Sequence, residues 1–256
     1  MIPFPSPDRD ATRTPRDAVH AIHVIHDGRL GARCAVLLAD AGVPVTLGAA
    51  DVMPLALPAD AIVVLATDRP RPSLALRIDA DAWKAGVPWT SGTLIAHEFR
   101  VGPSIVRGLT PCFDCWSRRV RSVALDLDAH DALETLARSD DRSPWFRGVF
   151  APVIEQVAAL LAAEALTLAQ RVMTTDAADR ADADAVHRGD ARLGLVWEGD
   201  AVAGALQVRR FASIGVCPRC SAHVHAATCA SALADYVRAQ PLAPREPSAA
   251  AKERTA

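Results

Sequence analysis

Two C-x-x-C motifs, far apart in the chain, constrain this sequence more than any other feature. The first is PCFDC, with Cys112 and Cys115, and the second is CPRC, with Cys217 and Cys220. Each motif presents two thiolates from one tight turn, and four thiolates match the tetrahedral, sulfur-rich coordination that zinc prefers. We therefore predict one zinc site, at which the two distant segments meet.

A thioredoxin-like redox pair is the alternative interpretation of either motif alone. We disfavour it for Cys112 and Cys115, because no helix opening that would lower a thiol pKa is predicted directly after them. A four-cysteine site leaves no coordination position open, so the metal is expected to be structural rather than catalytic. Its predicted role is to close the loop between the motifs and stabilise the second half of the fold.

Other cysteines and histidines receive simpler interpretations. Cys34 falls on the apolar face of a predicted helix, where a buried core thiol is expected. Cys229 lies near the C-terminal end, in a stretch that could form a last helix. His223 and His225 flank the second motif, and we expect both at the surface because four cysteines already complete a zinc site.

Composition and charge exclude some classes of protein. The formal net charge is -2, which predicts no general affinity for nucleic acid or anionic membranes. No run approaches the roughly 20 uninterrupted apolar residues that span a bilayer, and the N-terminal residues lack the apolar region of a signal peptide. We expect a cytoplasmic protein, where paired cysteines indicate metal or redox chemistry before disulfides.

Short apolar runs alternate with helical stretches over the first half of the chain. Strands are predicted over residues 21–26, 43–48, 61–67 and 87–96, and helices over residues 29–42 and 71–86. This alternation predicts a parallel, doubly wound α/β sheet. Right-handed crossovers would then bring Asp27 and Asp68, which follow two of the strands, to one edge of the sheet.

The second half has a different pattern. Residues 98–107 are predicted as a further strand, and residues 118–147 as helix and loop. Residues 152–171 form a long apolar helix, with Pro152 in its first turn. An acidic loop at 176–190 precedes a hairpin over 191–211, just before the second C-x-x-C motif.

The first strand runs into the segment HDGRLG, which resembles half of a nucleotide fingerprint. A dinucleotide or ATP motif reads G-x-G-x-x-G at this place, but His26 stands where its first glycine would be. Gly28 and Gly31 remain candidate cofactor-binding residues. Asp68 is the third candidate, although it could instead cap the helix at 71–86. Because Gly48 and not an acid ends the second strand, catalytic use of ATP is not expected.

In their order along the chain, these features resemble the ThiF/MoeB superfamily, the bacterial relatives of ubiquitin-activating enzymes. The matching pieces, over roughly residues 20–222, are AIHVIHDGRLG, VVLATD, GVPWTSG, PCFDC, GVFAPVIEQVAALLAAEALTL and GVCPRC. The resemblance implies a Rossmann-like, doubly wound, mostly parallel sheet over 19–107 and a zinc-clamped half with an antiparallel hairpin over 108–239. Residues 1–18 and 240–256 are predicted to be a disordered leader and tail.

Departures from the family pattern indicate a catalytically depleted member. His26 and Gly48 replace a glycine and an acid of the pattern, and the asparagine and arginine expected around 51–58 have no match. No cysteine occurs between 116 and 216, where group-transferring members place their nucleophile. Asp68 does match the acid that follows the family's third strand.

One branch of the superfamily fits this description. Residues 101–119 resemble a segment of the ThiF-like cyclodehydratase partner, or leader-peptide-binding, proteins of thiazole/oxazole-modified peptide (bacteriocin) biosynthesis. The resemblance implies a non-catalytic partner that delivers a precursor peptide to a YcaO-type cyclodehydratase, which itself uses ATP. A homodimer is expected by analogy. Three basic residues could face a partner or an acidic leader, or form a solvated charged surface, namely Arg118, Arg119 and Arg121.

Two other functions remain open at this stage. One is an ATP-dependent adenylyltransferase of the ThiF/MoeB type, acting on a sulfur-carrier or peptide C-terminus. The other is a nucleotide- or NAD-sensing module, supported only by the loop from Asp27 to Gly31.

Overall fold

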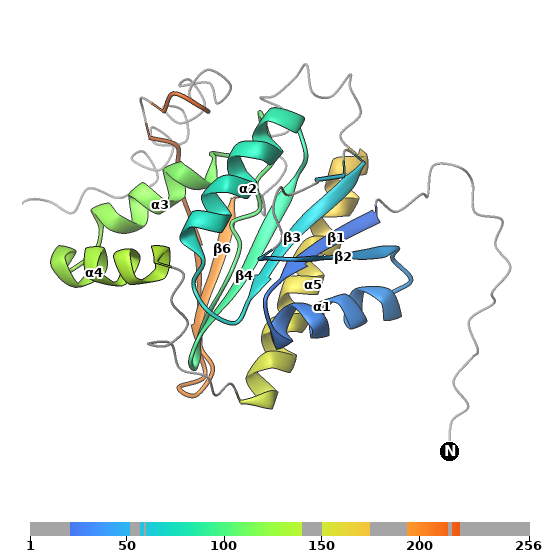
Figure 1. Cartoon of the computed structure of the whole chain (residues 1–256), viewed down its shortest axis with the longest axis horizontal. Helices are drawn as coiled ribbons and strands as arrows, with labels where there is room; N and C mark the ends of the chain where they lie inside the picture. The colour runs from blue at the N-terminus through green and yellow to red at the C-terminus, as the bar shows by residue number, and fades with distance from the viewer. Residues whose placement is uncertain are drawn as a thin grey trace, which may run out of the picture.

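The computed structural model describes residues 21–51, 57–58, 60–139, 150–174, 194–214 and 217–220 (Figure 1). The predictions of a leader over 1–18, a loop over 176–190 and a tail over 240–256 lie outside these residues. The predicted positions of His223, His225 and Cys229 also lie outside them.

Seven strands form a single mixed sheet in the order β2-β1-β3-β4-β5-β6-β7 (Figure 1). The strands are β1 (Ala21–His26), β2 (Val45–Ala49), β3 (Ala61–Thr67), β4 (Trp89–Ile95), β5 (Glu98–Val101), β6 (Leu195–Asp200) and β7 (Ala205–Arg210). The first four pair in parallel, whereas β4 with β5, β5 with β6 and β6 with β7 are antiparallel. The predicted α/β class is confirmed, but the antiparallel part extends beyond the predicted hairpin.

The antiparallel half begins because the chain reverses directly after β4. Ala96, at the turn, has a φ of 59°, and β5 then returns beside β4. The strand predicted over 98–107 is shorter than expected and ends at Val101. Pro103 has no N–H to donate to a neighbouring strand, which accounts for this early end. The hairpin of β6 and β7 joins the same sheet through β5.

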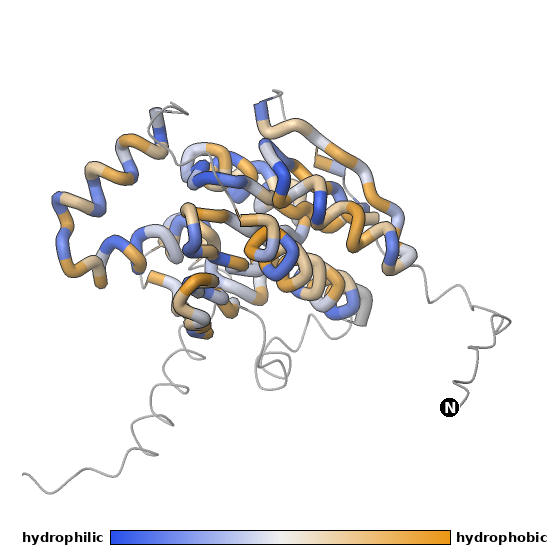
Figure 2. Tube along the Cα trace, turned by 90° about the horizontal axis from the view of Figure 1, so that it is seen from below, coloured by the Kyte–Doolittle hydropathy of each residue, from blue (hydrophilic) through white to orange (hydrophobic). Residues whose placement is uncertain are grey.

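The described residues contain five helices, four of which cover the two faces of the sheet. The five helices are α1 (Arg29–Asp40), α2 (Pro72–Ala85), α3 (Phe113–Ser122), α4 (Leu127–Arg138) and α5 (Ala151–Thr174). α1 and α5 pack on one face, while α2 and α3 pack on the other and α4 packs on α2. In Figure 1, α2 lies in front of the sheet and α5 behind it. Hydrophobic and hydrophilic residues alternate along the helical turns, as expected for helices with one buried side (Figure 2).

The central strand β3 is buried along its whole length, as the sequence predicts. Its alternate residues face opposite layers, so that Val64 packs with α1 and α5, whereas Val63 and Leu65 pack with α2 and α3. Cys34 of α1 is fully buried in the first of these layers, which confirms its interpretation as a core thiol.

Helix α5 has the length and mean hydropathy of a membrane-spanning helix between Ala151 and Val172, which the count of uninterrupted apolar residues missed. Half of this window is buried inside the protein, against α1 and β4. Glu164, in the middle of the helix, accepts a 2.6 Å hydrogen bond from the buried hydroxyl of Ser104. These contacts are those of a core helix.

Candidate metal centre and the sheet edge

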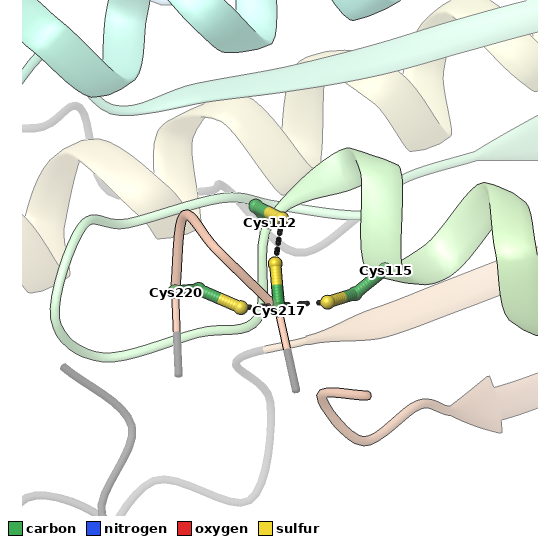
Figure 3. Close-up of side chains that lie close together, drawn as sticks. All are labelled: Cys112, Cys115, Cys217 and Cys220. Atoms are coloured by element: carbon green, nitrogen blue, oxygen red, sulfur yellow. Dashed lines mark hydrogen bonds between the residues drawn. The ribbon is translucent and has the colours of Figure 1, made fainter. Parts of the chain in front are cut away.

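The structure brings the four predicted cysteines together. Their Sγ atoms all lie within 4.8 Å of one another, and all four side chains are buried. Figure 3 shows the sulfur atoms of Cys112 and Cys115, from the start of α3, pointing toward those of Cys217 and Cys220. Two segments that are 105 residues apart in sequence therefore meet at one point.

The sulfur spacing is suited to a metal ion. Cys112 Sγ lies 3.6 Å from Cys217 Sγ, and Cys115 Sγ lies 3.4 Å from Cys220 Sγ. A disulfide would need about 2.05 Å. Four sulfurs at about 2.3 Å from a tetrahedral zinc are about 3.8 Å apart. The cluster can hold a metal ion, and its donor set and spacing are compatible with zinc.

The prediction that no helix opens directly after Cys112 and Cys115 is wrong. Cys112 is the N-cap of α3, which begins at Phe113, so a helix does open directly at the first motif. The proline-cysteine pattern and the polar residues that follow it concealed this start. The geometry now distinguishes the two interpretations, because Cys112 lies against Cys217 of the other motif in a four-sulfur cluster.

The four thiols cannot all ionise in the absence of a cation. Hydrogen bonding from the Cys220 thiol lowers the pKa of Cys112 to about 5, so this residue ionises first. Burial raises the pKa of Cys115 to about 12. The hydrogen bond that Cys220 makes to Cys112 raises the pKa of Cys220 as well. A bound metal would supply the positive charge that allows the remaining thiols to deprotonate.

A buried acid on α2, which the sequence analysis missed, connects both cysteine motifs. Asp79 is fully buried, and its Oδ1 accepts a 3.1 Å hydrogen bond from the backbone N–H of Phe113. Its Oδ2 forms an ion pair with Arg219, between the cysteines of the second motif. The available signal was an acid among the apolar positions of the helix predicted over 71–86.

Further contacts hold the chain around the cluster. The backbone N–H of Ile214 lies 3.4 Å from Cys115 Sγ, and Arg119 donates a 3.0 Å hydrogen bond to the carbonyl of Ser213. The rings of Trp89 and Phe113 contact each other in a tilted arrangement with centroids 5.4 Å apart, and those of Phe113 and Trp116 do the same at 4.9 Å. The cysteine cluster is thus continuous with the aromatic part of the core.

The three candidate cofactor-binding residues lie together at the start of α1. Gly28 is the N-cap of this helix, and Asp68 follows β3 on the neighbouring strand. Asp68 Oδ2 accepts a 2.8 Å hydrogen bond from the N–H of Arg29, and its Oδ1 a 2.9 Å bond from that of Leu30. Asp68 therefore caps α1 and not α2, whose N-cap is Arg71.

The carboxylate of Asp68 occupies the position at which an anion would bind the start of α1. Free N–H groups at a helix start attract phosphate, and here the chain's own acid accepts from two of them. A Cβ at Gly28 would collide with the carboxylate of Asp68, and one at Gly31 would collide with Cβ of His26. The two glycines thus allow close contact within the protein itself.

Asp27, also predicted at this edge, belongs to a buried ion-pair network. Its Oδ1 accepts a 3.2 Å hydrogen bond from the N–H of Asp68, which confirms that these two acids meet. Arg71 Nη1 lies 3.0 Å from Asp27 Oδ2 and 3.1 Å from Asp51 Oδ1. The pairing of Arg71 with Asp27 and Asp51 was not predicted from the sequence.

The fold and the cysteine cluster define an α/β protein with a mixed seven-stranded sheet and four cysteines that could hold a metal ion, and solved structures share this fold. A heterocyclase in complex with substrate and cofactor matches with a TM-score of 0.60 and 16% identity over 79% of this chain. The E. coli microcin synthetase McbBCD complex matches with a TM-score of 0.56 and 15% identity over 81%. E. coli MccB gives a TM-score of 0.56 and 15% identity over 82%.

The three matches cover different fractions of the solved chains. The chain spans 26% of the heterocyclase chain, 71% of the McbBCD chain and 68% of MccB. It therefore corresponds to about a quarter of the heterocyclase. No family model matches the sequence, and no curated protein matches it either. The predicted resemblance to proteins of modified-peptide biosynthesis is confirmed at the level of the fold.

Proposed function

We propose that this chain is a non-catalytic, ThiF-like partner protein in the biosynthesis of azole- or azoline-modified ribosomal peptides. It would work with a YcaO-type cyclodehydratase, which carries out the ATP-dependent ring closure on a precursor peptide. The observation that carries the proposal is the fold shared with a heterocyclase in complex with substrate and cofactor and with the McbBCD synthetase. The segment over residues 101–119 supports the same branch.

The start of α1 supports a role without nucleotide chemistry. The carboxylate of Asp68 accepts from the N–H groups of Arg29 and Leu30, so an incoming phosphate would have to displace it. The negative charge of the Asp68 carboxylate would also repel a phosphate at this position. The chain would then depend on its partner for ATP.

We further propose that the four-cysteine cluster holds a structural zinc ion. Four sulfur ligands would complete a tetrahedral coordination sphere and leave no position for a substrate or water. The ion would join the start of α3 to the segment that follows β7. Its contribution would be to the stability of the second half of the fold.

The arginines after the first cysteine motif favour the interpretation as a solvated charged surface. Arg118 pairs with Asp114 at 3.0 Å and Arg121 pairs with Asp131 at 2.6 Å, both at exposed positions. Arg119 donates to the carbonyl of Ser213.

A second candidate is an adenylyltransferase acting on a peptide or sulfur-carrier C-terminus. The match to E. coli MccB with AMPCPP and MccA favours it, at a TM-score of 0.54 and 16% identity. This activity requires bound MgATP. Calorimetric titration with MgATP, together with pyrophosphate exchange, distinguishes the two candidates, since the non-catalytic partner should give neither signal.

The decisive experiment reconstitutes the proposed reaction. The purified protein is combined with a YcaO-type cyclodehydratase and a Cys/Ser/Thr-rich precursor encoded beside its gene, and loss of one water per ring is followed by mass spectrometry. We expect co-purification with the cyclodehydratase and a heterocycle yield that falls when this chain is omitted. Light scattering of the same sample would show whether it is a homodimer. Absence of binding and an unchanged yield would refute the proposal.

A further inference from the structure

A cavity outside both the metal centre and the start of α1 opens between the sheet and three helices. It has a volume of about 230 Å³, and its walls come from β3, β4 and β5, from the start of α2, and from α3 and α4. Both α3 and α4 contact α2, which holds the three helices around it. Known ligand pockets typically measure about 300–1,000 Å³, so this cavity suits a single side chain with its backbone rather than a nucleotide.

The deep wall of the cavity is apolar. The aromatic residues Phe113 and Trp116 of α3 line it, together with Leu65 of β3. These three side chains are at most 8% exposed. Leu133 of α4 also lines the cavity but is 58% exposed, so an apolar side chain at the rim remains uncovered in the folded chain.

The charged residues of the wall are already paired. Arg71 is held by Asp27 and Asp51, and Arg100 Nε lies 3.0 Å from Glu198 Oε1. Arg100 also stacks over the Trp116 ring at 4.5 Å. Glu134 pairs with Arg138 at 3.2 Å. A charged ligand group would have to break one of these pairs.

Two of the wall hydroxyls, those of Ser91 and Thr93, have partners as well. Ser91 donates a 2.9 Å hydrogen bond to the carbonyl of Gly102, and Thr93 and Thr67 share one of 3.2 Å. His130 of α4 also lines the cavity, and an imidazole can hydrogen-bond to a peptide amide or carbonyl. The chemistry therefore selects a neutral, apolar group attached to a polar backbone.

We propose that this cavity binds one uncharged apolar side chain, aromatic or aliphatic, of the precursor peptide. The inference rests on the proposed function, because that function supplies a peptide. It assigns a recognition site to a chain whose proposed role is to hold a substrate for another enzyme. It also connects the cavity to the cysteine cluster, since the wall residues Phe113 and Trp116 directly follow Cys112 and Cys115.

The test uses the full-length, metal-loaded protein and two small probes, N-acetyl-L-phenylalaninamide and N-acetyl-L-leucinamide. Binding is followed by two-dimensional amide and indole NMR, with N-acetyl-L-glutaminamide as the polar control probe. We expect saturable shifts with the two apolar probes, including the indole N–H of Trp116, and none with the polar probe.

Two variants of exposed leucines provide matched controls. Leu133→Asp places an unpaired carboxylate at the rim and should weaken the binding of both apolar probes at least about ten-fold. Leu125→Asp changes a fully exposed leucine that does not line the cavity and should leave binding unchanged. Neither position is in the core, so both variants should fold.

The outcomes separate this inference from the proposed function. No saturable shift, equal binding of the polar probe, or unchanged affinity in Leu133→Asp would overturn the inference. If the probes bind as expected but the cyclodehydratase does not, the proposed function fails and the apolar site stands. If reconstitution succeeds and the probes do not bind, the inference fails alone.

Discussion

Asp79 of α2 forms an ion pair with Arg219, which lies between the two cysteines of the second motif. The same carboxylate accepts a hydrogen bond from the backbone N–H of Phe113, next to Cys112 of the first motif. Because Asp79 is fully buried and touches both motifs, it links the cysteine cluster to the helices that cover this face of the sheet. Helix α2 thus supports the cluster together with the two cysteine motifs.

Replacing Asp79 by asparagine tests this link. The amide oxygen can still accept from Phe113, but the charge that pairs with Arg219 is lost. We expect a loss of about 2 kcal/mol in unfolding free energy by urea titration, as for a hydrogen bond to a charged group. Metal content should not change, because the four cysteines remain. The control Asp114→Asn breaks an exposed pair with Arg118 and should have little effect; equal stability of the two variants would contradict the link.

If the four-cysteine cluster binds the metal, replacing one of its cysteines should remove the metal, whereas replacing a cysteine outside the cluster should not. Cys112→Ser and Cys217→Ser should each lose the ion and melt at a lower temperature, because metal binding contributes to folding. Cys34→Ser changes a buried thiol outside the cluster and should keep its metal. Elemental analysis measures the metal, and near-ultraviolet circular dichroism should report the loosened rings of Trp89, Phe113 and Trp116. Stoichiometric metal in the first two variants would refute the assignment.

Metal binding should release protons and strengthen with rising pH. At neutral pH the thiol of Cys115 is protonated in the metal-free protein, since burial raises its pKa to about 12, whereas Cys112, with a pKa of about 5, is already ionised. The protonated thiols must ionise when metal binds, so affinity is weaker at low pH and increases between about pH 5 and pH 8. Calorimetry in buffers of different ionisation enthalpy should show more than one proton released per metal. An affinity independent of pH would be inconsistent with thiolate ligation.

Because the carboxylate of Asp68 caps α1, we expect an anion from solution to restore part of the stability that is lost when this carboxylate is removed. Asp68→Ala should lose about 1 kcal/mol, as for other cap removals, and should be partly restored by sulfate compared with chloride at equal ionic strength. Asp126→Ala removes the cap of α4, where Asp126 accepts from the N–H of Ala129. The α4 variant should show little sulfate rescue, because Asp128 in its first turn repels anions, whereas α1 has no acid there. An equal sulfate response in both variants would contradict the anion-like role of Asp68.

Two arginine variants compare a buried and an exposed ion pair. Arg71 and Asp27 have side chains only 4% and 2% exposed, so Arg71→Met leaves a buried carboxylate that keeps an ion pair with Arg69 at 3.9 Å. We expect a loss of about 3 kcal/mol. Arg121→Met breaks an exposed pair with Asp131 and should change the unfolding midpoint very little. Similar midpoints for the two variants would show that the Asp27 network does not stabilise the fold.

Local patterns predicted the elements whose burial is regular. β1 and β3 have the predicted bounds, because each is a short, mostly apolar run of the length typical of a buried strand. The helices over 29–42 and 71–86 were also predicted, each ending near a glycine. β5 was predicted too long, because its pairing with β6 and its end before Pro103 depend on strands distant in sequence.

The four cysteines were predicted to meet because their short spacings limit the chemistry they can perform. In contrast, Asp79 with Arg219 and Arg71 with Asp27 could not be paired from sequence, since many acids and arginines of the chain are equivalent until the elements pack. The role of Asp68 was likewise undecided between a ligand and a cap of the following helix.

The sequence by itself determined the alternation of strands and helices, the buried thiol of Cys34 and the residues able to ligate a metal, since each depends on spacing along one segment. The tertiary structure alone decided the direction of β5, the partners of the buried acids and the existence of the apolar cavity. These features arise from contacts between segments that are remote in the chain, and their energies depend on burial, which no local pattern specifies.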